Sequence, residues 1–465
     1  MFRNTAGLGR DKFLSMQIIT DLHIHSRFSR ACSKDLTLEN IDKFCQIKGV
    51  DIVATGDFTH PQWFKEIKER LVEKETGLYI LKNSPVKSPE GDHWALTRFI
   101  CATEISCIYT RDNKCRRLHV CILAPNLKAV EKINNSLEKA GCNLKADGRP
   151  IIGMDVRDLA RICFEVDEKC MIIPAHIWTP WFAMFGSKSG FDNIQECWGE
   201  YSDKIFAIET GLSSDPQMNW RIKNLDNVSI ISNSDAHSLP NIAREANVFE
   251  VAENKLNYNN ICEIIKNNPV KSRVTQNHGI KPRGGNVALR GASFLYTIEF
   301  YPEEGMYHFD GHRDCKFSCK PKESKKLKNI CPICKKELVI GVMNRVEELA
   351  EQDRPENYID KNRVPFKKLI ELDKIIAESL NIKSRSSKRV QTEYKNLVNN
   401  FANEFEILLN ISRENLNKIT LPEIAEGIIR VRQGKVRIKP GFDGQYGEIK
   451  IFNNNERACF QKSLF

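Results

Sequence analysis

The chain has 465 residues, of which 41% are hydrophobic and 28% are charged. This length is too great for one average domain, and the composition is that of a globular protein rather than of a fibrous or disordered chain. No apolar run approaches the roughly 18 residues that a membrane span needs, so a membrane-spanning protein is excluded and no membrane partner is expected. The net charge of +10 is compatible with a polyanionic partner such as nucleic acid.

The sixteen cysteines stand mostly alone inside apolar segments such as "DKFCQIKG" and "RLHVCILA". That usage is typical of a reducing cytoplasm and not of a disulfide framework, so we expect a cytoplasmic protein. Residues 1–15 lack the apolar centre of a secretory signal, and we expect them to form a disordered tail.

Residues 16–287 alternate short apolar runs with amphipathic stretches. "QIITDLHIH" is followed by "TLENIDKFCQIKGV", and further strand-like runs occur at "DIVATGDFTH", "RFICATEIS", "RLHVCILA", "MIIPAHIW", "IFAIETGL" and "VSIISNSDAHS". Repeated strand-then-helix units predict an α/β fold with parallel strands, either open or closed into a barrel. Polar residues follow each strand, at the end where such a barrel carries its active site.

Histidines and carboxylates recur at these predicted strand ends. Residues two apart on a strand share a face, so His23 and His25 of "TDLHIHSRFSRA" can enter one site. The other strand ends supply Asp57, His60, Glu104, His119, His176, Asp235 and His237. Imidazole and carboxylate together suit zinc, manganese or iron, and this set could hold two or three ions. Clustered ions favour phosphoryl chemistry, because they can hold a hydroxide nucleophile, neutralise the phosphate and stabilise the leaving oxygen.

The order "DLHIH", "TGDFTH", "TEIS", "LHV", "PAH" and "SDAH" resembles the polymerase and histidinol phosphatase (PHP) family. The resemblance implies a distorted barrel of seven strand–helix units, a (β/α)7 barrel, with a trinuclear metal site. By motif it assigns as metal ligands His23, His25, Glu104, His119, His176, Asp235 and His237. Among these, the residues expected to take part directly in catalysis are Glu104, His176, Asp235 and His237.

Two departures from the family pattern leave the metal count open. The second motif reads "GDFTH" where the family has TDH, so Asp57, His60 or both are candidate ligands, and we favour Asp57. "SRFSRAC" offers no equivalent of a further ligand that some relatives carry after HxH. We therefore expect two or three ions of zinc, manganese or magnesium. Asp21 is expected to orient an imidazole by a hydrogen bond, and Glu209 is expected to support the ligands in the same way.

A second, small domain is expected over residues 288–345, after the Gly- and Arg-rich passage "RVTQNHGIKPRGGNVALRG". Cys331 and Cys334 have the spacing of a zinc knuckle. His312 and Cys315 repeat this spacing and are favoured as the other pair for one structural zinc, with Cys319 as the alternative. Lysines around this zinc ribbon suit a phosphate backbone, and the predicted contacts are Lys320, Lys322, Lys325 and Lys326.

Residues 346–465 have helical apolar spacing in "FKKLIELDKIIAESL" and "VQTEYKNLVNNFANEFEILL". We expect a third, mostly helical domain there. The order of parts, a PHP barrel, a zinc ribbon and a helical domain, resembles the endonuclease Q family of archaeal and bacterial DNA repair enzymes. The segments that carry this resemblance include "DLHIHSRFSRA", "ETGLSSDPQMNWR", "YHFDGHRDC" and "PGFDGQYGEIKIF".

The resemblance implies a substrate and a reaction. The substrate would be double- or single-stranded DNA with a deaminated base (uracil, hypoxanthine or xanthine) or an abasic site. A metal-activated hydroxide would cut the phosphodiester 5′ of the lesion and leave a 3′-hydroxyl and a 5′-phosphate. The location would be prokaryotic and nucleoid-associated. The alternative enzyme is a PHP phosphatase or a DNA exonuclease without lesion specificity, and a different class is a binding module that keeps metal only for structure.

The segment after His176, "IWTPWFAMFGSKSGFD", is a candidate for reading a base. An enzyme that inspects a base must usually take it out of the stack and hold it in a pocket. Trp178 and Trp181 can wedge or stack, and a turn of Gly186, Ser187, Lys188 and Ser189 can offer hydrogen bonds. A packed lid with ordinary hydrophobic anchors is the other interpretation.

The last residues of the chain, "CFQKSLF", resemble the start of the motif by which archaeal replication proteins bind the sliding clamp (PCNA). The clamp contacts would be Gln461, Leu464 and Phe465, and a frayed tail is the alternative.

Overall fold

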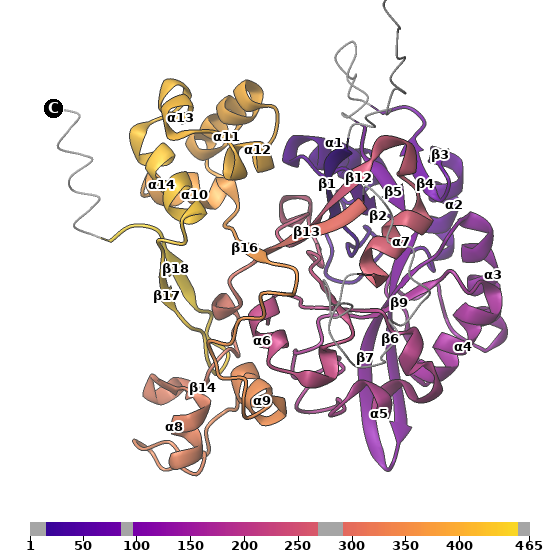
Figure 1. Cartoon of the computed structure of the whole chain (residues 1–465), viewed down its shortest axis with the longest axis horizontal. Coiled ribbons are helices and arrows are strands. Elements are labelled where there is room, and N and C mark those ends of the chain that lie inside the picture. The colour runs from indigo at the N-terminus through magenta and orange to yellow at the C-terminus, as the bar shows by residue number, and fades with distance from the viewer. Residues whose placement is uncertain (1–14, 85–95, 268–291, 454–465) are drawn as a thin grey trace, which may run out of the picture.

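The structure, a computed structural model, describes residues 15–84, 96–267 and 292–453 (Figure 1). Residues 1–14 of the expected tail, the Gly- and Arg-rich passage and the predicted clamp contacts lie outside the described residues. None of the helices in the described part combines the length and apolar composition that crossing a bilayer requires.

One wall of the barrel is a sheet of short buried strands. β1 (Ser15–Asp21) pairs in parallel with β2 (Ile52–Ala54), and β2 pairs in parallel with β5 (Arg98–Ile100). β2 and β5 are wholly buried, as expected for parallel strands covered on both faces. The sheet continues beyond β5 through an antiparallel pair, β4 (Leu78–Leu81) and β3 (Leu71–Glu75).

The second wall contains an antiparallel hairpin where an all-parallel barrel was expected. β6 (Ala102–Arg111) and β7 (Lys114–Leu123) are joined by Asp112 and Asn113, both with positive φ. Such a two-residue turn matches the twist of paired strands and leaves no room for a crossover helix. β8 (Ile151–Ile152) and β9 (Met171–Pro174) complete this sheet in the order β8-β6-β7-β9.

The remaining strands close the barrel. β10 (Ala207–Glu209) pairs in parallel with β11 (Ser229–Ile231), and an isolated bridge joins Ile24 to Ala236. β12 (Ala246–Ala252) runs antiparallel to β1 and carries the first sheet on to β13 (Ala292–Glu299) and β16 (Phe366–Lys368). The predicted distorted α/β barrel is confirmed. Its sheet runs past residue 288, where a domain boundary was predicted, and the boundaries stay a prediction.

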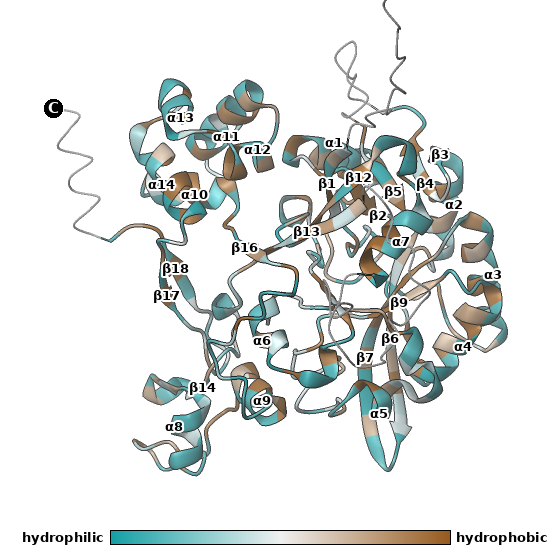
Figure 2. Ribbon diagram, in the orientation of Figure 1, coloured by the Kyte–Doolittle hydropathy of each residue, from teal (hydrophilic) through white to brown (hydrophobic). Residues whose placement is uncertain are grey.

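Helices cover the outside of the barrel (Figure 1). They are α1 (Leu38–Lys48), α2 (Pro61–Arg70), α3 (Leu127–Lys139), α4 (Val156–Val166), α5 (Ile194–Trp198), α6 (Pro216–Trp220) and α7 (Tyr258–Lys266). α4 shows why these sequences form surface helices: Asp155 caps its first turn, and Val156, Leu159, Ala160 and Cys163 form one buried stripe. Figure 2 shows hydrophobic residues concentrated on the central strands, whereas the outer helices carry both kinds.

The chain beyond β13 forms the ribbon and the C-terminal helices. The ribbon contains β14 (Asp310–His312), β15 (Phe317–Cys319) and α8 (Pro321–Lys326), and α9 (Val342–Leu349) follows it. The C-terminal helices are α10 (Leu372–Ser379), α11 (Lys388–Phe401), α12 (Glu404–Leu409), α13 (Arg413–Ile419) and α14 (Pro422–Arg432). The helical C-terminal part is confirmed, and an antiparallel pair follows it, β17 (Arg437–Lys439) and β18 (Glu448–Lys450).

Short 3-10 segments connect these elements. They are η2 (Gly199–Lys204), η3 (Lys223–Leu225), η4 (Leu239–Asn241), η5 (Glu253–Lys255), η6 (Pro302–Glu304) and η7 (Arg313–Cys315).

Candidate metal centre

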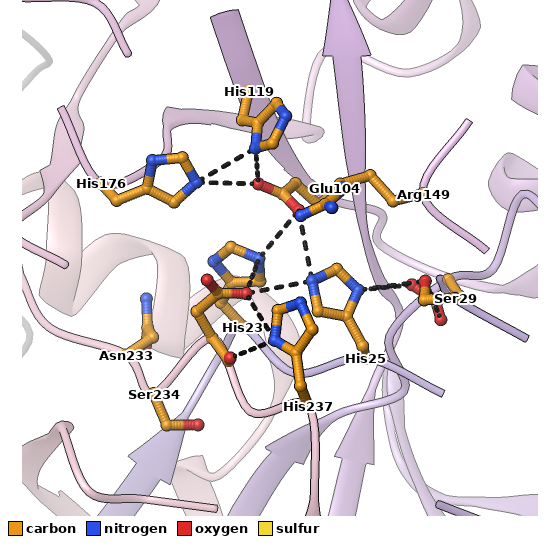
Figure 3. A network of polar contacts seen from close by, with 12 residues as sticks. His23, His25, Ser29, Glu104, His119, Arg149, His176, Asn233, Ser234 and His237 are labelled. Carbon is orange, nitrogen blue, oxygen red and sulfur yellow. Dashed lines mark hydrogen bonds and ion pairs between the residues drawn. The ribbon is translucent and has the colours of Figure 1, made fainter. Parts of the chain in front are cut away.

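The ends of several barrel strands bring buried imidazoles and carboxylates together (Figure 3). Four of them form a first donor group: His23, His25, Glu104 and Asp235 offer ligand atoms that all lie within 4.8 Å of one another. His25 Nε2 lies 3.0 Å from Asp235 Oδ1 and 3.2 Å from Glu104 Oε2. His23 Nε2 lies 3.6 Å from the same Glu104 oxygen.

Glu104 also belongs to a second donor group with His119 and His176. Its other oxygen, Oε1, lies 2.7 Å from His119 Nδ1 and 3.1 Å from His176 Nε2. The antiparallel pairing of β6 and β7 causes this proximity, because Ser106 lies opposite His119 and Glu104 opposite Cys121, so all four side chains share one face. Glu104 therefore has one oxygen in each group and joins the two.

The residues present fit divalent ions. His23 Nε2 is buried and has no hydrogen-bond partner, which is costly unless a ligand occupies that direction. His119 Nδ1 and His176 Nε2 face each other at 3.2 Å, an arrangement of two ring nitrogens that a shared cation would satisfy. Nitrogen and carboxylate oxygen donors of this kind suit zinc, manganese or iron.

Two carboxylates orient the first pair of imidazoles from behind. Both oxygens of Glu209 lie 3.0 Å from His23 Nδ1, and Asp57 Oδ1 lies 2.9 Å from His25 Nδ1. Each carboxylate accepts the ring Nδ1–H, which fixes the tautomer and leaves Nε2 to face the site. Glu209 also accepts the backbone N–H of His176 at 2.9 Å and so supports both groups.

Asp57, the favoured candidate of its motif, lies behind His25 and in neither donor group. Its second oxygen accepts the backbone N–H and hydroxyl of Ser26 and the hydroxyl of Ser29, so hydrogen bonds already occupy both oxygens. His60 lies in neither donor group. Its ring stacks on that of Phe28, with 4.4 Å between the ring centres. The "GDFTH" motif therefore supplies an orienting carboxylate to the described centre.

Asp21 also differs from its predicted role. Its carboxylate accepts the backbone N–H and hydroxyl of Ser234 and the backbone N–H of Ala243, and it touches no imidazole ring. Burial raises the pKa of Asp21 to about 6. Asp21 thus fixes the backbone after β11 that carries Asp235.

His237 lies at the rim of the centre and outside both donor groups. Its Nδ1–H donates to the backbone carbonyl of Asp235 at 2.8 Å, and its ring lies 4.6 Å from that of His25. Its side chain is 30% exposed, so it is accessible to a molecule that approaches the centre.

The carboxylates of the centre favour positive charge there, and the pKa values of its side chains reflect this. Burial opposes charge on His23, but Cys121, Glu209 and Glu104 together outweigh burial and hold the pKa of His23 well above its ordinary value. Burial likewise opposes ionisation of Glu104, yet His119, His23 and Arg149 lower its pKa. Burial lowers the pKa of His119 to about 4, so this imidazole is neutral near pH 7 and available as a donor.

Backbone strain gathers at the same place. Asp57, His176 and Asp235 each follow a barrel strand and each have positive φ, at 44°, 29° and 46°. Positive φ is costly for residues with a Cβ and persists where the surrounding structure enforces it, often at functional sites. A Cβ on Gly211 would lie 2.3 Å from that of His176, so glycine leaves the space that this imidazole needs.

Sequence reasoning missed Arg149. Its guanidinium reaches the centre from the loop before β8, and Nη1 lies 3.1 Å from Glu104 Oε2, with a quarter of the side chain exposed. No motif marks this arginine, because "ADGRP" belongs to a loop and not to a strand end.

The ribbon contains a separate donor group of His312, Cys315, Cys331 and Cys334. Cys334 Sγ lies 3.7 Å from His312 Nδ1. Burial opposes ionisation of Cys331, but the N–H groups of Cys334 and Ile333 outweigh it and lower the pKa of the thiol. Cys319 is buried and packs with Leu338 outside this group, so the favoured pairing and not the alternative agrees with the structure.

The segment predicted to read a base is divided between core and surface. Trp178 is 1% exposed and donates to Asn219, which corrects its assignment as a base contact. Trp181 is 49% exposed, with the Arg117 guanidinium 5.2 Å from its ring centre. In the following turn Ser187 and Lys188 are exposed, whereas Gly186 and Ser189 are buried.

The predicted DNA-contacting lysines lie on the ribbon surface. Lys320, Lys322, Lys325 and Lys326 are all exposed, and Lys320 pairs with Glu356 at 2.7 Å.

Comparison with solved structures gives the same arrangement of parts. The chain superposes on the crystal structure of the lesion-specific endonuclease PfuEndoQ from Pyrococcus furiosus with a TM-score of 0.76 and 27% identity, covering 94% of this chain and 95% of that one. The chain has the fold of endonuclease Q. Endonuclease Q in complex with a 27-mer duplex substrate carrying an abasic lesion at the active site gives a TM-score of 0.75 and 28% identity, over 94% of this chain and 97% of that one.

Sequence comparisons agree with this fold over parts of the chain. The MJ0043 C-terminal domain family matches residues 371–435, which contain α10 to α14. The protein MJ0043 of Methanocaldococcus jannaschii is 32% identical over 280 residues, which are 59% of this chain and 31% of that protein. The match to endonuclease Q structures covers the barrel, the ribbon and the helices together, so the predicted likeness to endonuclease Q is confirmed.

Proposed function

We propose that this chain is a metal-dependent DNA repair endonuclease. It would cut the phosphodiester 5′ of a deaminated base (uracil, hypoxanthine or xanthine) or of an abasic site and leave a 3′-hydroxyl and a 5′-phosphate. The observation that carries the proposal is the pair of donor groups joined by Glu104, inside a fold shared with a lesion-specific endonuclease.

The residues that would hold the ions are His23, His25, Glu104 and Asp235 in one group and Glu104, His119 and His176 in the other. Divalent ions bound there would supply Lewis-acid charge to phosphate oxygens and lower the pKa of water. A further group of possible ligands in the barrel consists of His23, Cys121 and Glu209, and it shares His23 with the first donor group.

The chain's own residues prepare this centre. Glu209 and Asp57 accept the Nδ1–H groups of His23 and His25, so that both Nε2 atoms face the site as candidate metal ligands. Burial opposes ionisation of Asp235, but His25 and His23 lower its pKa, so it is a carboxylate at neutral pH. Arg149, partly exposed beside Glu104, can donate its remaining N–H groups to a phosphate oxygen.

Two surfaces suit a DNA partner. Exposed Trp181, on the segment that follows His176, pairs with the half-buried Arg117 of β7, and bases stack on such groups. The exposed lysines of the ribbon suit phosphates. Ser187 and Lys188 are exposed and would contact a base, whereas Trp178 packs in the core.

The test is a cleavage assay with manganese or magnesium on labelled duplexes that hold a single uracil, hypoxanthine or normal base. The expected product maps to the 5′ side of the lesion, is absent from the normal duplex and is lost in Asp235→Asn. Glu138→Gln, which neutralises an exposed carboxylate on α3, is the matched control and should cut normally.

Other outcomes identify the alternatives. Equal cutting of all three duplexes, or digestion from their ends, would indicate a nuclease without lesion specificity. Hydrolysis of small phosphomonoesters alone would indicate a phosphatase. Binding of DNA without any cleavage would indicate a binding module.

A further inference from the structure

The segment 177–192, here called the centre loop, directly contacts two of the metal-centre histidines. Its Phe182 carbonyl accepts the backbone N–H of His119 at 3.0 Å, and the two rings lie 4.8 Å apart. The hydroxyl of Thr179 lies 3.3 Å from His176 Nδ1. The position of the centre loop therefore bears on both imidazoles of the second donor group.

A buried arginine from outside the barrel holds this loop. Arg345 of α9 is 9% exposed, and its Nε donates to the carbonyl of Phe185 at 3.2 Å. Its Nη2 donates to the carbonyl of Phe191 at 3.2 Å and to the carboxylate of Asp192. The planar fork of a guanidinium can bind these acceptors together, which an ammonium group cannot do.

The start of α9 is fixed to the ribbon. The Asp310 carboxylate accepts the backbone N–H of Gly341 at 2.7 Å and the side-chain amide of Asn344 at 2.6 Å. Asp310 is wholly buried and lies on β14 with the zinc-group histidine, His312. A Cβ on Gly341 would lie 2.6 Å from the backbone of Phe309, so the contact between α9 and the ribbon needs glycine there.

We propose that Arg345 is a positioning residue for the metal centre, and that α9 couples zinc binding in the ribbon to the conformation of the centre loop. Zinc at His312 and the three cysteines orders β14, β14 fixes α9 through Asp310, and Arg345 fixes the loop against His119 and His176. The ribbon then contributes to turnover as well as to DNA binding. The activity part of this inference rests on the proposed function, whereas the structural part does not.

The experiment measures hydrogen exchange of the centre loop together with cleavage of a uracil duplex by the full chain. The test variants are Arg345→Lys, which keeps the charge and loses the fork, and Asp192→Asn, whose side chain is 68% exposed and so contributes little to the core. The matched control is Arg363→Lys, because Arg363 also donates to carbonyls of a barrel loop, at Leu225, Asp226 and Val228.

Both test variants should raise exchange in 177–192 and lower kcat by roughly 10-fold or more, since small misplacements at a reacting centre are costly. The dissociation constant for DNA and the metal content should stay unchanged, and Arg363→Lys should affect neither measurement. Removal of ribbon zinc by Cys334→Ser should raise exchange in the same segment.

Unchanged exchange in Arg345→Lys and Asp192→Asn would overturn the positioning role, and unchanged exchange in Cys334→Ser would overturn the coupling. If Arg345→Lys fails to fold, Asp192→Asn decides. If the unmodified protein cuts no uracil duplex, the proposed function fails, and the exchange measurements still decide the coupling.

Discussion

The two candidate metal sites of this molecule differ in the chemistry and burial of their ligands. In the barrel, the donors are buried imidazoles and carboxylates, and a further carboxylate orients His23 and another orients His25. In the ribbon, His312, Cys315 and Cys334 are half-buried and Cys331 is buried, between short strands and turns. A closed thiolate-rich set holds one zinc for structure, whereas mixed oxygen and nitrogen donors leave positions for substrate. Under the proposed function, this difference would place the chemistry in the barrel, and the ribbon zinc would fold a part that contacts DNA.

The largest effect is expected when Glu104 is changed, because it is the donor common to both groups. Glu104→Gln should lower kcat by more than the roughly 100-fold that loss of an orienting partner costs. Metal analysis should show loss of barrel ions with ribbon zinc retained. Normal barrel metal content and normal turnover would remove the basis for a joined centre.

Cys334→Ser tests the other side of the comparison. One zinc should be lost while barrel metal is kept, because the two sites share no ligand. DNA affinity should fall by about 10-fold or more, since a ribbon of this size depends on its metal for folding. Loss of barrel metal in this variant would show that the two regions are not separate sites.

Asp57→Asn separates an orienting carboxylate from a ligand. The expected result is about a 10- to 100-fold loss of metal affinity, with the full number of ions restored at high metal concentration. The measurement is a metal titration followed by calorimetry. A permanently lower number of ions would restore Asp57 as a direct ligand.

Replacing Lys322, Lys325 and Lys326 by alanine tests the ribbon as a phosphate-binding surface. For every lysine that binds a phosphate, its replacement should reduce the slope of log Kd against log salt by about 0.9, without changing lesion preference. Alanine at Lys128, Lys132 and Lys139, which are exposed on α3, is the matched control. Equal slopes in the two triple variants would place the DNA-binding surface elsewhere.

The smallest effect concerns a buried carboxylate that has no imidazole partner. Burial raises the pKa of Glu299 to about 8, although hydrogen bonds from Ser232 and Thr297 oppose this. The folded chain keeps this proton up to about pH 8 and the unfolded chain loses it near 4.5, so stability falls as pH rises between these values. Glu299→Gln should flatten this dependence in urea unfolding measured at pH 5 and pH 8, and an unchanged dependence would contradict it.

The sequence predicted the candidate metal ligands of the centre better than the residues that hold those ligands in place. His23, His25, Glu104, His119, His176 and Asp235 could be found because they stand at strand ends, and strand ends of a barrel meet at one face. The roles of Asp21 and Asp57 could not be assigned, since which ring nitrogen a carboxylate meets depends on three-dimensional placement. Arg149 comes from a loop, and Trp178 could not be told from an exposed aromatic by spacing alone.

We propose that Glu104 joins two ions in one barrel centre, and electron paramagnetic resonance of the manganese-loaded protein can detect such a pair of ions. We predict a spectrum of two exchange-coupled Mn²⁺ ions, retained in Cys334→Ser and lost in Glu104→Gln. A spectrum of isolated Mn²⁺ ions alone, with or without Glu104, would contradict the claim.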